Sequence, residues 1–133
     1  MRSIIKQSVD LSASGEVLYG MYLDPAVHQA ITGQPVTISA EEGSLFSAFG
    51  GALSGQTLAV IEGTLIIQSW RSTSFHADDQ DSTLILSFSS HDGGGRIDLV
   101  HLDVPKHDYQ GVTAGWEKYY WTPWREYLSQ QVS

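Results

Sequence analysis

Residues 116–128 read Trp-Glu-Lys-Tyr-Tyr-Trp-Thr-Pro-Trp-Arg-Glu-Tyr-Leu, and this stretch decides how the chain folds. Counted from its first tryptophan, large apolar residues recur at positions i+3, i+4, i+7, i+8, i+11 and i+12, which is the spacing of an amphipathic helix. The opposite face carries Glu117, Lys118, Thr122, Arg125 and Glu126. The spacing predicts a helix over 115–128, with Thr113 as a suitable N-cap and an apolar face that covers a sheet.

Pro123 interrupts the predicted helix, because it lacks a backbone N–H and removes one helical hydrogen bond. The resulting kink costs ~3 kcal/mol, whereas each large buried side chain contributes ~1.5–3 kcal/mol. The summed burial energy of the residues on this face therefore exceeds the cost of the kink several-fold. This holds although burial energies of this kind are upper estimates. Trp121 falls outside the apolar face, and we expect it to rest on Arg125 one turn later.

The apolar face of this helix is aromatic where a plain core would use leucine and isoleucine. Buried tyrosine and tryptophan carry polar atoms that need partners, and a cavity holding water or an amphipathic ligand would supply them. An ordinary core with tyrosine tips that reach solvent explains the same residues equally well. Because a bent helix leaves room above a sheet, we expect any pocket to lie near Trp116, Tyr119 and Tyr120.

The N-terminal third predicts one strand and two short helices. In the expected strand 3–11, Ile5, Val9 and Leu11 share one side, but Gln7 interrupts the apolar alternation there. Ser14 is a plausible N-cap for the first helix. Asp24-Pro25 begins the second helix, and Gly33 ends it.

The middle of the chain is rich in strand patterns, expected at 35–39, 44–49, 52–61, 64–72, 82–89 and 96–104. Most gaps between them are short and contain glycine, which favours an antiparallel meander. Alternation places Leu84, Leu86 and Phe88 on one face, and Ile97, Leu99 and His101 likewise. We therefore predict an α+β fold in which about seven antiparallel strands are covered on one face.

Composition narrows the class of protein. The 133 residues fit a single domain, 1–133. A net charge of −8 without a cluster of lysine and arginine argues against nucleic-acid binding. The lack of cysteine excludes disulfides and thiolate nucleophiles. Since no stretch approaches the ~20 apolar residues of a membrane span and no signal-peptide core is present, we expect a cytoplasmic protein.

Several segments together resemble one known family. They are Leu23-Asp24-Pro25 followed by His28 and Thr32-Gly33, then Gly43-Ser44-Leu45-Phe46-Ser47, Ile67-Gln68-Ser69-Trp70-Arg71, Val104-Pro105, and Gly111 with Gly115-Trp116-Glu117-Lys118-Tyr119-Tyr120-Trp121-Thr122-Pro123. In this order they resemble the activator of heat-shock protein 90 ATPase homologue family, in its C-terminal-domain form. That family belongs to the START-like (SRPBCC) superfamily, together with polyketide cyclases and lipid carriers. The resemblance runs from about residue 3 to residue 130.

The resemblance implies a helix-grip fold of order β-α-α-β6-α, in which a curved antiparallel sheet wraps around a long C-terminal helix. It also implies that small members bind poorly defined ligands, and that a chaperone ATPase is a possible partner in a stress response. One position departs from the family pattern, because Phe49 is followed by Gly50-Gly51 where the family often has "FDG". Any role of that carboxylate is lost here.

The candidate ligand-binding residues follow from the face assignments and the last helix. They are Phe46, Trp70, Phe88, Leu99, His101, Trp116, Tyr119 and Tyr120. His101 can bind a polar group of a ligand or act as acid or base, or it can be hydrogen-bonded to a tyrosine of the last helix. Arg71 must point away from the face that carries Trp70.

One polar loop, at His76, Asp78, Asp79 and Asp81, has the residue types that hold a divalent cation. It lacks the glycine and closing glutamate of a calcium loop, so a solvated loop is the favoured interpretation. His91-Asp92 and His107-Asp108 lie near turns and are expected at the surface. We accordingly predict neither a metal nor a cofactor, and no set of nucleophile, base and orienting residue can be chosen.

Three functions remain open. The first is a START-like domain that binds an apolar or aromatic small molecule between the sheet and the last helix. The second is an interaction module acting on a chaperone ATPase, by family analogy. The third is a cyclase-like enzyme, which needs acid and base groups that converge inside the cavity. The pattern favours binding over catalysis.

Overall fold

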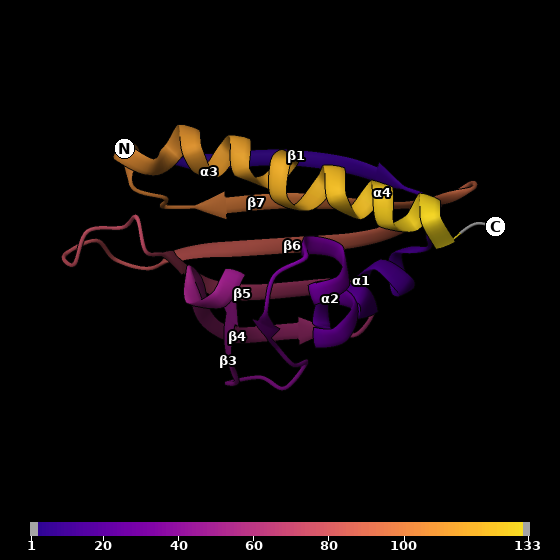
Figure 1. The fold of residues 1–133 in the computed structure, drawn as a ribbon, viewed down its shortest axis with the longest axis horizontal. Coiled ribbons are helices and arrows are strands. Elements are labelled where there is room, and N and C mark those ends of the chain that lie inside the picture. Colours follow the sequence, from indigo (N-terminus) through magenta and orange to yellow (C-terminus); the bar gives the residue numbers. More distant parts are fainter. Residues whose placement is uncertain (1–2, 132–133) are drawn as a thin grey trace.

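The computed structural model describes residues 3–131, and Figure 1 shows the order of their elements. They are β1 (Ile4–Leu11), α1 (Gly15–Leu23), α2 (Pro25–Thr32), β2 (Val36–Thr37), β3 (Leu45–Ala48), η1 (Phe49–Gly51), β4 (Leu53–Ile61), β5 (Leu65–Ser72), β6 (Ser82–His91), β7 (Gly94–Leu102), η2 (Lys106–Asp108), α3 (Tyr109–Trp116), η3 (Glu117–Trp121) and α4 (Thr122–Gln131).

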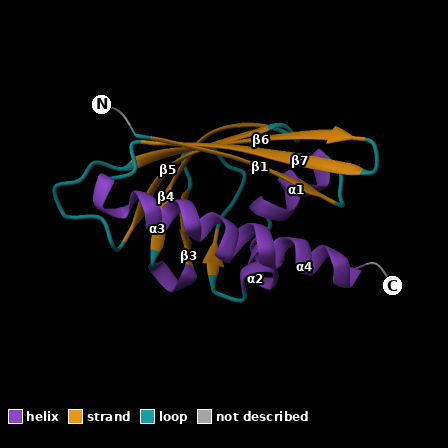
Figure 2. Ribbon diagram, turned by 90° about the horizontal axis from the view of Figure 1, so that it is seen from above, coloured by secondary structure: helices purple, strands orange, loops and turns teal. Residues whose placement is uncertain are grey.

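One antiparallel sheet of seven strands, in the order β1-β7-β6-β5-β4-β3-β2, forms the frame of this fold. The meander from β2 to β7 was predicted from the short glycine-bearing gaps, and it is confirmed. β1 pairs with β7, with Ile5 opposite His101 and Val9 opposite Ile97. α3, η3 and α4 form one long helical segment along a single face of the sheet, as Figure 2 shows from above.

The covered face carries the side chains that alternation assigned to it. Leu84, Leu86, Ile97 and Leu99 are almost completely buried, and so is His101. Alternation predicts this correctly because successive side chains of a strand point to opposite faces, and only one face of these strands meets the helix.

Both short helices begin and end as their sequences predict. The Ser14 hydroxyl accepts from the Val17 backbone N–H at 3.2 Å, and the Asp24 carboxylate accepts from the Ala26 N–H at 2.9 Å. Gly33 ends α2 with a positive φ of 76°, a conformation that favours glycine.

Several strands differ in length from their predicted ranges. β2 holds two residues, and β3 ends before Phe49, which enters a short 3-10 turn with a φ of 54°. β7 begins at Gly94, so Gly94 and Gly95 lie in the strand and not in the turn. A Cβ at Gly94 would meet the Leu11 carbonyl oxygen at 2.4 Å, so the chain after β1 requires glycine here.

The last helix begins earlier than predicted, at Tyr109. Thr113 is not its N-cap, because its hydroxyl donates to the Tyr109 carbonyl from inside the first turns, at 2.7 Å. Before Pro123 the helix contains a π-helical turn, Glu117–Trp121, in which the Thr122 N–H bonds to the Glu117 carbonyl. The irregularity expected from the proline therefore takes the form of a widened turn.

This π-helical turn changes which side chains face the sheet. Trp121 is buried, and its indole N–H donates to the Gln7 side chain at 2.7 Å, so its predicted position on Arg125 is wrong. Tyr119, predicted on the buried face, is 48% exposed. A wider turn advances each later residue around the axis by less than α-helical spacing assumes, and the apolar stripe shifts accordingly.

Within residues 3–131, the helices are too short or too polar to cross a membrane.

Candidate functional site

A hollow of about 460 Å³ lies between the sheet and the first half of the last helix. Trp70 of β5 forms one wall, and Trp116, Tyr119 and Tyr120 form the other. Its edge is polar, with exposed Thr73 and Ser74 after β5 and half-buried Asp108 before α3. The remaining lining residues are Phe49, Ala52, Leu53, Ser72, Gly111, Val112 and Gly115.

The aromatic rings around the hollow contact one another in a continuous row. The ring centroids of Trp70 and Trp116 are 6.2 Å apart, and those of Trp116 and Tyr120 are 4.9 Å apart. Phe49 meets Tyr119 edge to face at 5.7 Å. Such contacts stabilise each ring by about 0.5–1.5 kcal/mol beyond its burial, so the wall is held in place without a ligand.

His101 lies behind this wall and is part of a chain of buried hydrogen bonds. The Trp116 indole N–H donates to His101 Nδ1 at 3.2 Å, and since an indole can only donate, Nδ1 carries no proton. His101 Nε2–H therefore donates to the Ser82 hydroxyl at 2.8 Å, and Ser82 donates to the Trp70 carbonyl at 2.7 Å. The partners of His101 are thus a tryptophan and a serine, and its predicted bond to a tyrosine is wrong.

A second buried network contains a residue that sequence reasoning did not select. His28 of α2 donates from Nδ1 to the Tyr22 carbonyl at 2.7 Å and accepts at Nε2 from the Tyr120 hydroxyl at 2.9 Å. The Tyr22 hydroxyl donates to Gln68 at 2.9 Å. The signal for His28 was its spacing of three residues from Ile31, which places both on the buried side of α2.

Burial sets the protonation of both histidines. Desolvation lowers the pKa of His101 from 6.5 to about 3. Desolvation also lowers the pKa of His28, although the hydrogen bond to the Tyr22 carbonyl opposes the shift. Both rings are therefore neutral at pH 7, and both nitrogens of each ring are engaged within the protein. This arrangement suits positioning of the wall more than proton transfer to a ligand.

The eight predicted ligand-binding residues divide into two groups. Trp70, Trp116, Tyr119 and Tyr120 line the hollow, whereas Phe46, Phe88, Leu99 and His101 are buried outside it.

Two of the residues outside the hollow have packing partners that explain their places. Phe88 meets Tyr19 of α1 edge to face at 5.7 Å, and Phe46 lies against Gly55, where an added Cβ would approach its ring to 2.6 Å. Alternation identified the correct face for Phe88, but α1 covers one end of that face, and the sequence pattern does not show which end.

Sequence reasoning also missed the glycines of the helix wall. Gly111 and Gly115 are four residues apart in α3 and both line the hollow. Residues at this spacing share one helix face, and two glycines there leave space where side chains would otherwise fill it. This spacing was visible in the sequence and was a usable signal.

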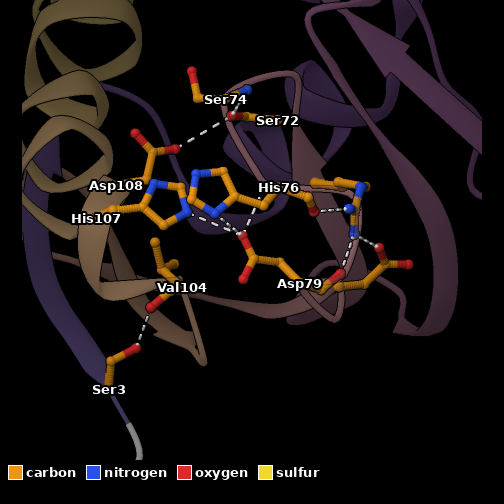
Figure 3. Close-up of polar contacts among 10 residues, drawn as sticks. Ser3, Ser72, Ser74, His76, Asp79, Val104, His107 and Asp108 are labelled. Carbon is orange, nitrogen blue, oxygen red and sulfur yellow. Dashed lines mark hydrogen bonds and ion pairs between the residues drawn. The ribbon is translucent and has the colours of Figure 1, made fainter.

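At one end of the hollow, the loop after β5 meets η2 through a cluster of His76, Asp79 and His107 (Figure 3). His107 Nε2 lies 3.0 Å from the Asp79 carboxylate, and the two imidazole rings stack with centroids 3.8 Å apart. The His107 hydrogen bond, with the His76 backbone N–H, lowers the pKa of Asp79. The expected surface position of His107 is correct, but its partnership with the loop was not predicted. Asp81 instead pairs with Arg71 at 3.1 Å.

A seven-stranded antiparallel sheet curved around a long C-terminal helix, with two short helices after the first strand, defines the helix-grip fold of START-like domains. The family model "Activator of Hsp90 ATPase homolog 1-like protein" matches residues 12–129, and the chain belongs to this family.

Relatives and solved structures agree with this assignment. The human "Activator of 90 kDa heat shock protein ATPase homolog 1" is 26% identical over 107 residues, covering 80% of this chain and 31% of the human protein. The Dictyostelium discoideum homologue is 24% identical over 116 residues, covering 86% of this chain and 30% of its own length. The chain thus spans about a third of these relatives.

Among solved structures, an HSP90 activator from Plasmodium falciparum superimposes with a TM-score of 0.80 at 19% identity, covering 90% of this chain and 91% of that one. The Aha1 dimer from Colwellia psychrerythraea gives 0.78 at 11% identity, covering 95% and 96%. At these identities the structures support the fold.

Proposed function

We propose that this chain binds an apolar or aromatic small molecule in the hollow between the sheet and the last helix. The observation that carries the proposal is the hollow itself, whose volume of about 460 Å³ lies within the usual range of ligand pockets. Aromatic rings face its interior and hydroxyl and carboxylate groups mark its edge, which is the composition of a site for a mainly apolar ligand.

The hydrogen bonds of the wall indicate how such a ligand would be oriented. The polar atoms of Trp116 and Tyr120 are engaged by His101 and His28, so these residues offer apolar ring atoms to the hollow. At the edge, the Asp108 carboxylate accepts from the Ser72 hydroxyl at 3.3 Å and has further accepting capacity. A flat ligand with a hydrogen-bond donor at one end would match this site, which has an apolar wall and an acceptor at its edge.

The test is a titration with 2-naphthol, followed by the NMR signals of the tryptophan indole N–H groups. Trp70 and Trp116 line the hollow, whereas Trp124 is buried farther along the helix and is absent from the described lining. We expect saturable shifts at the signals of Trp70 and Trp116, and little change at the signal of Trp124. Native mass spectrometry of the chain purified from its own host would show whether a natural molecule co-purifies.

Gly115→Leu is the variant that separates this site from non-specific binding. A Cβ at Gly115 meets Tyr119 at 3.6 Å, an ordinary contact, and a longer side chain would extend into the hollow. The matched control is Gly20→Leu in α1, where an added Cβ meets nothing within 4 Å. Naphthol binding should fall in the first variant only. Equal binding in both variants, or no saturable shift together with no co-purified molecule, would contradict the proposal.

A second candidate function follows from the family. The curated relatives are named activators of the 90 kDa heat shock protein ATPase, and we propose that this chain acts on a chaperone of that type in the cytoplasm, as part of a stress response. The test is steady-state ATP hydrolysis by the heat-shock protein 90 type chaperone of the same cell, with and without the chain. Unchanged turnover together with no co-precipitation would remove this candidate.

A further inference from the structure

The cluster at the edge of the hollow has the composition and placement of a metal site. We propose that His76, Asp79 and His107 bind a divalent transition-metal ion of the Zn²⁺ class. Each residue offers one ligand atom, and the three atoms lie within 4.8 Å of one another. His107 Nε2 is 3.0 Å and His76 Nδ1 is 3.9 Å from the same Asp79 oxygen, Oδ2.

The donor atoms select the class of metal. Imidazole nitrogen suits zinc, nickel and copper, whereas calcium and magnesium prefer sites made of oxygen. Zinc–nitrogen and zinc–oxygen bonds of roughly 2.0–2.2 Å in a tetrahedral site place neighbouring ligand atoms about 3.3 Å apart. The distances from the Asp79 oxygen lie on either side of that value. The stacked rings of His76 and His107 would tilt apart so that both nitrogens point at the metal. Water would complete the coordination.

The loop that carries His76 and Asp79 is held by Arg71, the arginine that points away from the hollow. Its guanidinium donates to the Asp79 and His76 carbonyls, each at 2.7 Å, and pairs with Asp81 at 3.1 Å. The Asp79 carboxylate also accepts from the His76 backbone N–H at 2.7 Å. Two of the three ligands are thus positioned by backbone contacts, as Figure 3 shows.

The segment that carries His107 is anchored separately. Val104 is buried, and its carbonyl accepts from the Ser3 hydroxyl at 2.7 Å. On the other side of His107, Asp108 accepts from the Ser72 hydroxyl. A third ligand therefore approaches the loop from a fixed position, while the His76 side chain, which is 65% exposed, remains free to tilt toward a metal. A metal there would fasten the loop to the start of α3.

The experiment uses the full chain without a histidine tag. Isothermal titration with Zn²⁺ measures stoichiometry and affinity, and Co²⁺ substitution reports coordination through its visible absorption. We expect one Zn²⁺ per chain, intense Co²⁺ bands typical of four-coordination, and a Tm that rises with Zn²⁺ concentration. His76→Ala and His107→Ala should each weaken binding by more than the roughly 10–100-fold loss typical of an outer-sphere partner.

The matched control is His91→Ala. His91 Nε2 lies 3.2 Å from the Asp10 carboxylate on the exposed surface, and Arg96 occupies the third position there instead of a ligand. This variant should bind Zn²⁺ as the parent chain does. Lack of stoichiometric uptake would overturn the proposal, and so would uptake that survives both His76→Ala and His107→Ala or falls equally in His91→Ala. Circular dichroism of each variant confirms that the fold is intact, so that lost binding reports the missing ligand.

Discussion

His101 makes the stability of this fold depend on pH. Its pKa falls from 6.5 to about 3 on folding because burial removes the ring from water. The hydrogen bonds point in the same direction, since the Trp116 N–H faces Nδ1 and leaves no acceptor for a second ring proton. Between these two pKa values the unfolded chain holds a proton that the folded chain does not, and stability therefore falls as the pH falls through this window.

The size of the effect follows from the two pKa values. Lowering the pH from 7 to 4.5 should remove about 2.5 kcal/mol through His101 alone. A folded pKa higher by one unit changes this figure by only about 0.1 kcal/mol, because pH 4.5 would still lie above it. The contribution is fully present above pH 6.5 and is lost progressively toward pH 3.

The assay is urea unfolding at a series of pH values between 7 and 4.5, followed by tryptophan fluorescence, for the parent chain and His101→Gln. The variant replaces the ring with an amide group that does not reproduce the positions of its two nitrogens, and it should be about 1–3 kcal/mol less stable at pH 7. Its pH dependence should be shallower by about 2.5 kcal/mol over the same range. Contributions of other groups, including the buried His28, are common to both chains and cancel in this difference.

Ser82→Ala is the matched control, because it removes the hydroxyl beside His101 Nε2 and leaves the titrating ring in place. It should lower stability at every pH and keep most of the slope. NMR of the His101 ring protons provides a measurement that needs no variant, with no titration expected down to pH 4.5. A ring that titrates near pH 6.5, or equal slopes for the parent chain and His101→Gln, would refute the reasoning.

Three further predictions concern the sheet and the last helix. Gly55→Ala should destabilise by about 1–3 kcal/mol in urea unfolding, because its Cβ would meet a β5 carbonyl oxygen at 1.9 Å; Gly20→Ala, in open space within α1, should instead stabilise by about 0.5–1 kcal/mol, and a reversed order would count against the packing described. Gln7→Leu should cost about 1–3 kcal/mol by leaving the buried Trp121 N–H unpaired, and Gln7→Glu, which keeps an acceptor, should cost less. Tyr120→Phe should cost about 1–2 kcal/mol in thermal unfolding, since the buried histidine of α2 loses its donor; an unchanged Tm would show that this hydrogen bond contributes nothing.

The strands could be predicted from the sequence because the alternation of buried and exposed side chains is a local pattern. A period of two placed Ile97, Leu99 and His101 on one face, and all three are buried. Gln7 appeared as a fault in the alternation of β1, yet its amide bonds the Trp121 N–H and the Thr113 carbonyl. The apparent fault in the alternation was therefore a polar contact with the last helix. Its partner Trp121 lies 114 residues away from Gln7 in the sequence.

The features that could not be predicted depend on contacts between distant segments or on a change of helical period. His28 and Tyr120 are 92 residues apart, and His107 and Asp79 are 28 residues apart, so neither pair leaves a local signature. Trp121 was misplaced because counting at 3.6 residues per turn assumes a regular α-helix, and the π-helical turn before Pro123 breaks that count. The proline indicated that the helix would be irregular, but not what form the irregularity would take.

The aromatic face of the last helix then has a different meaning from the one its composition first suggests. Aromatic residues were expected at a cavity because their polar atoms need partners, but the N–H of Trp116 and the hydroxyl of Tyr120 bind histidines inside the protein. Those bonds engage the polar atoms of both rings within the protein, so the ring atoms left for the hollow are apolar. Recognition of the proposed ligand would therefore depend on shape and stacking within the hollow, while hydrogen bonding would fall to the edge near Asp108. Since the proposed metal ligand His107 is its chain neighbour, metal binding would restrain this edge and leave the aromatic wall unchanged.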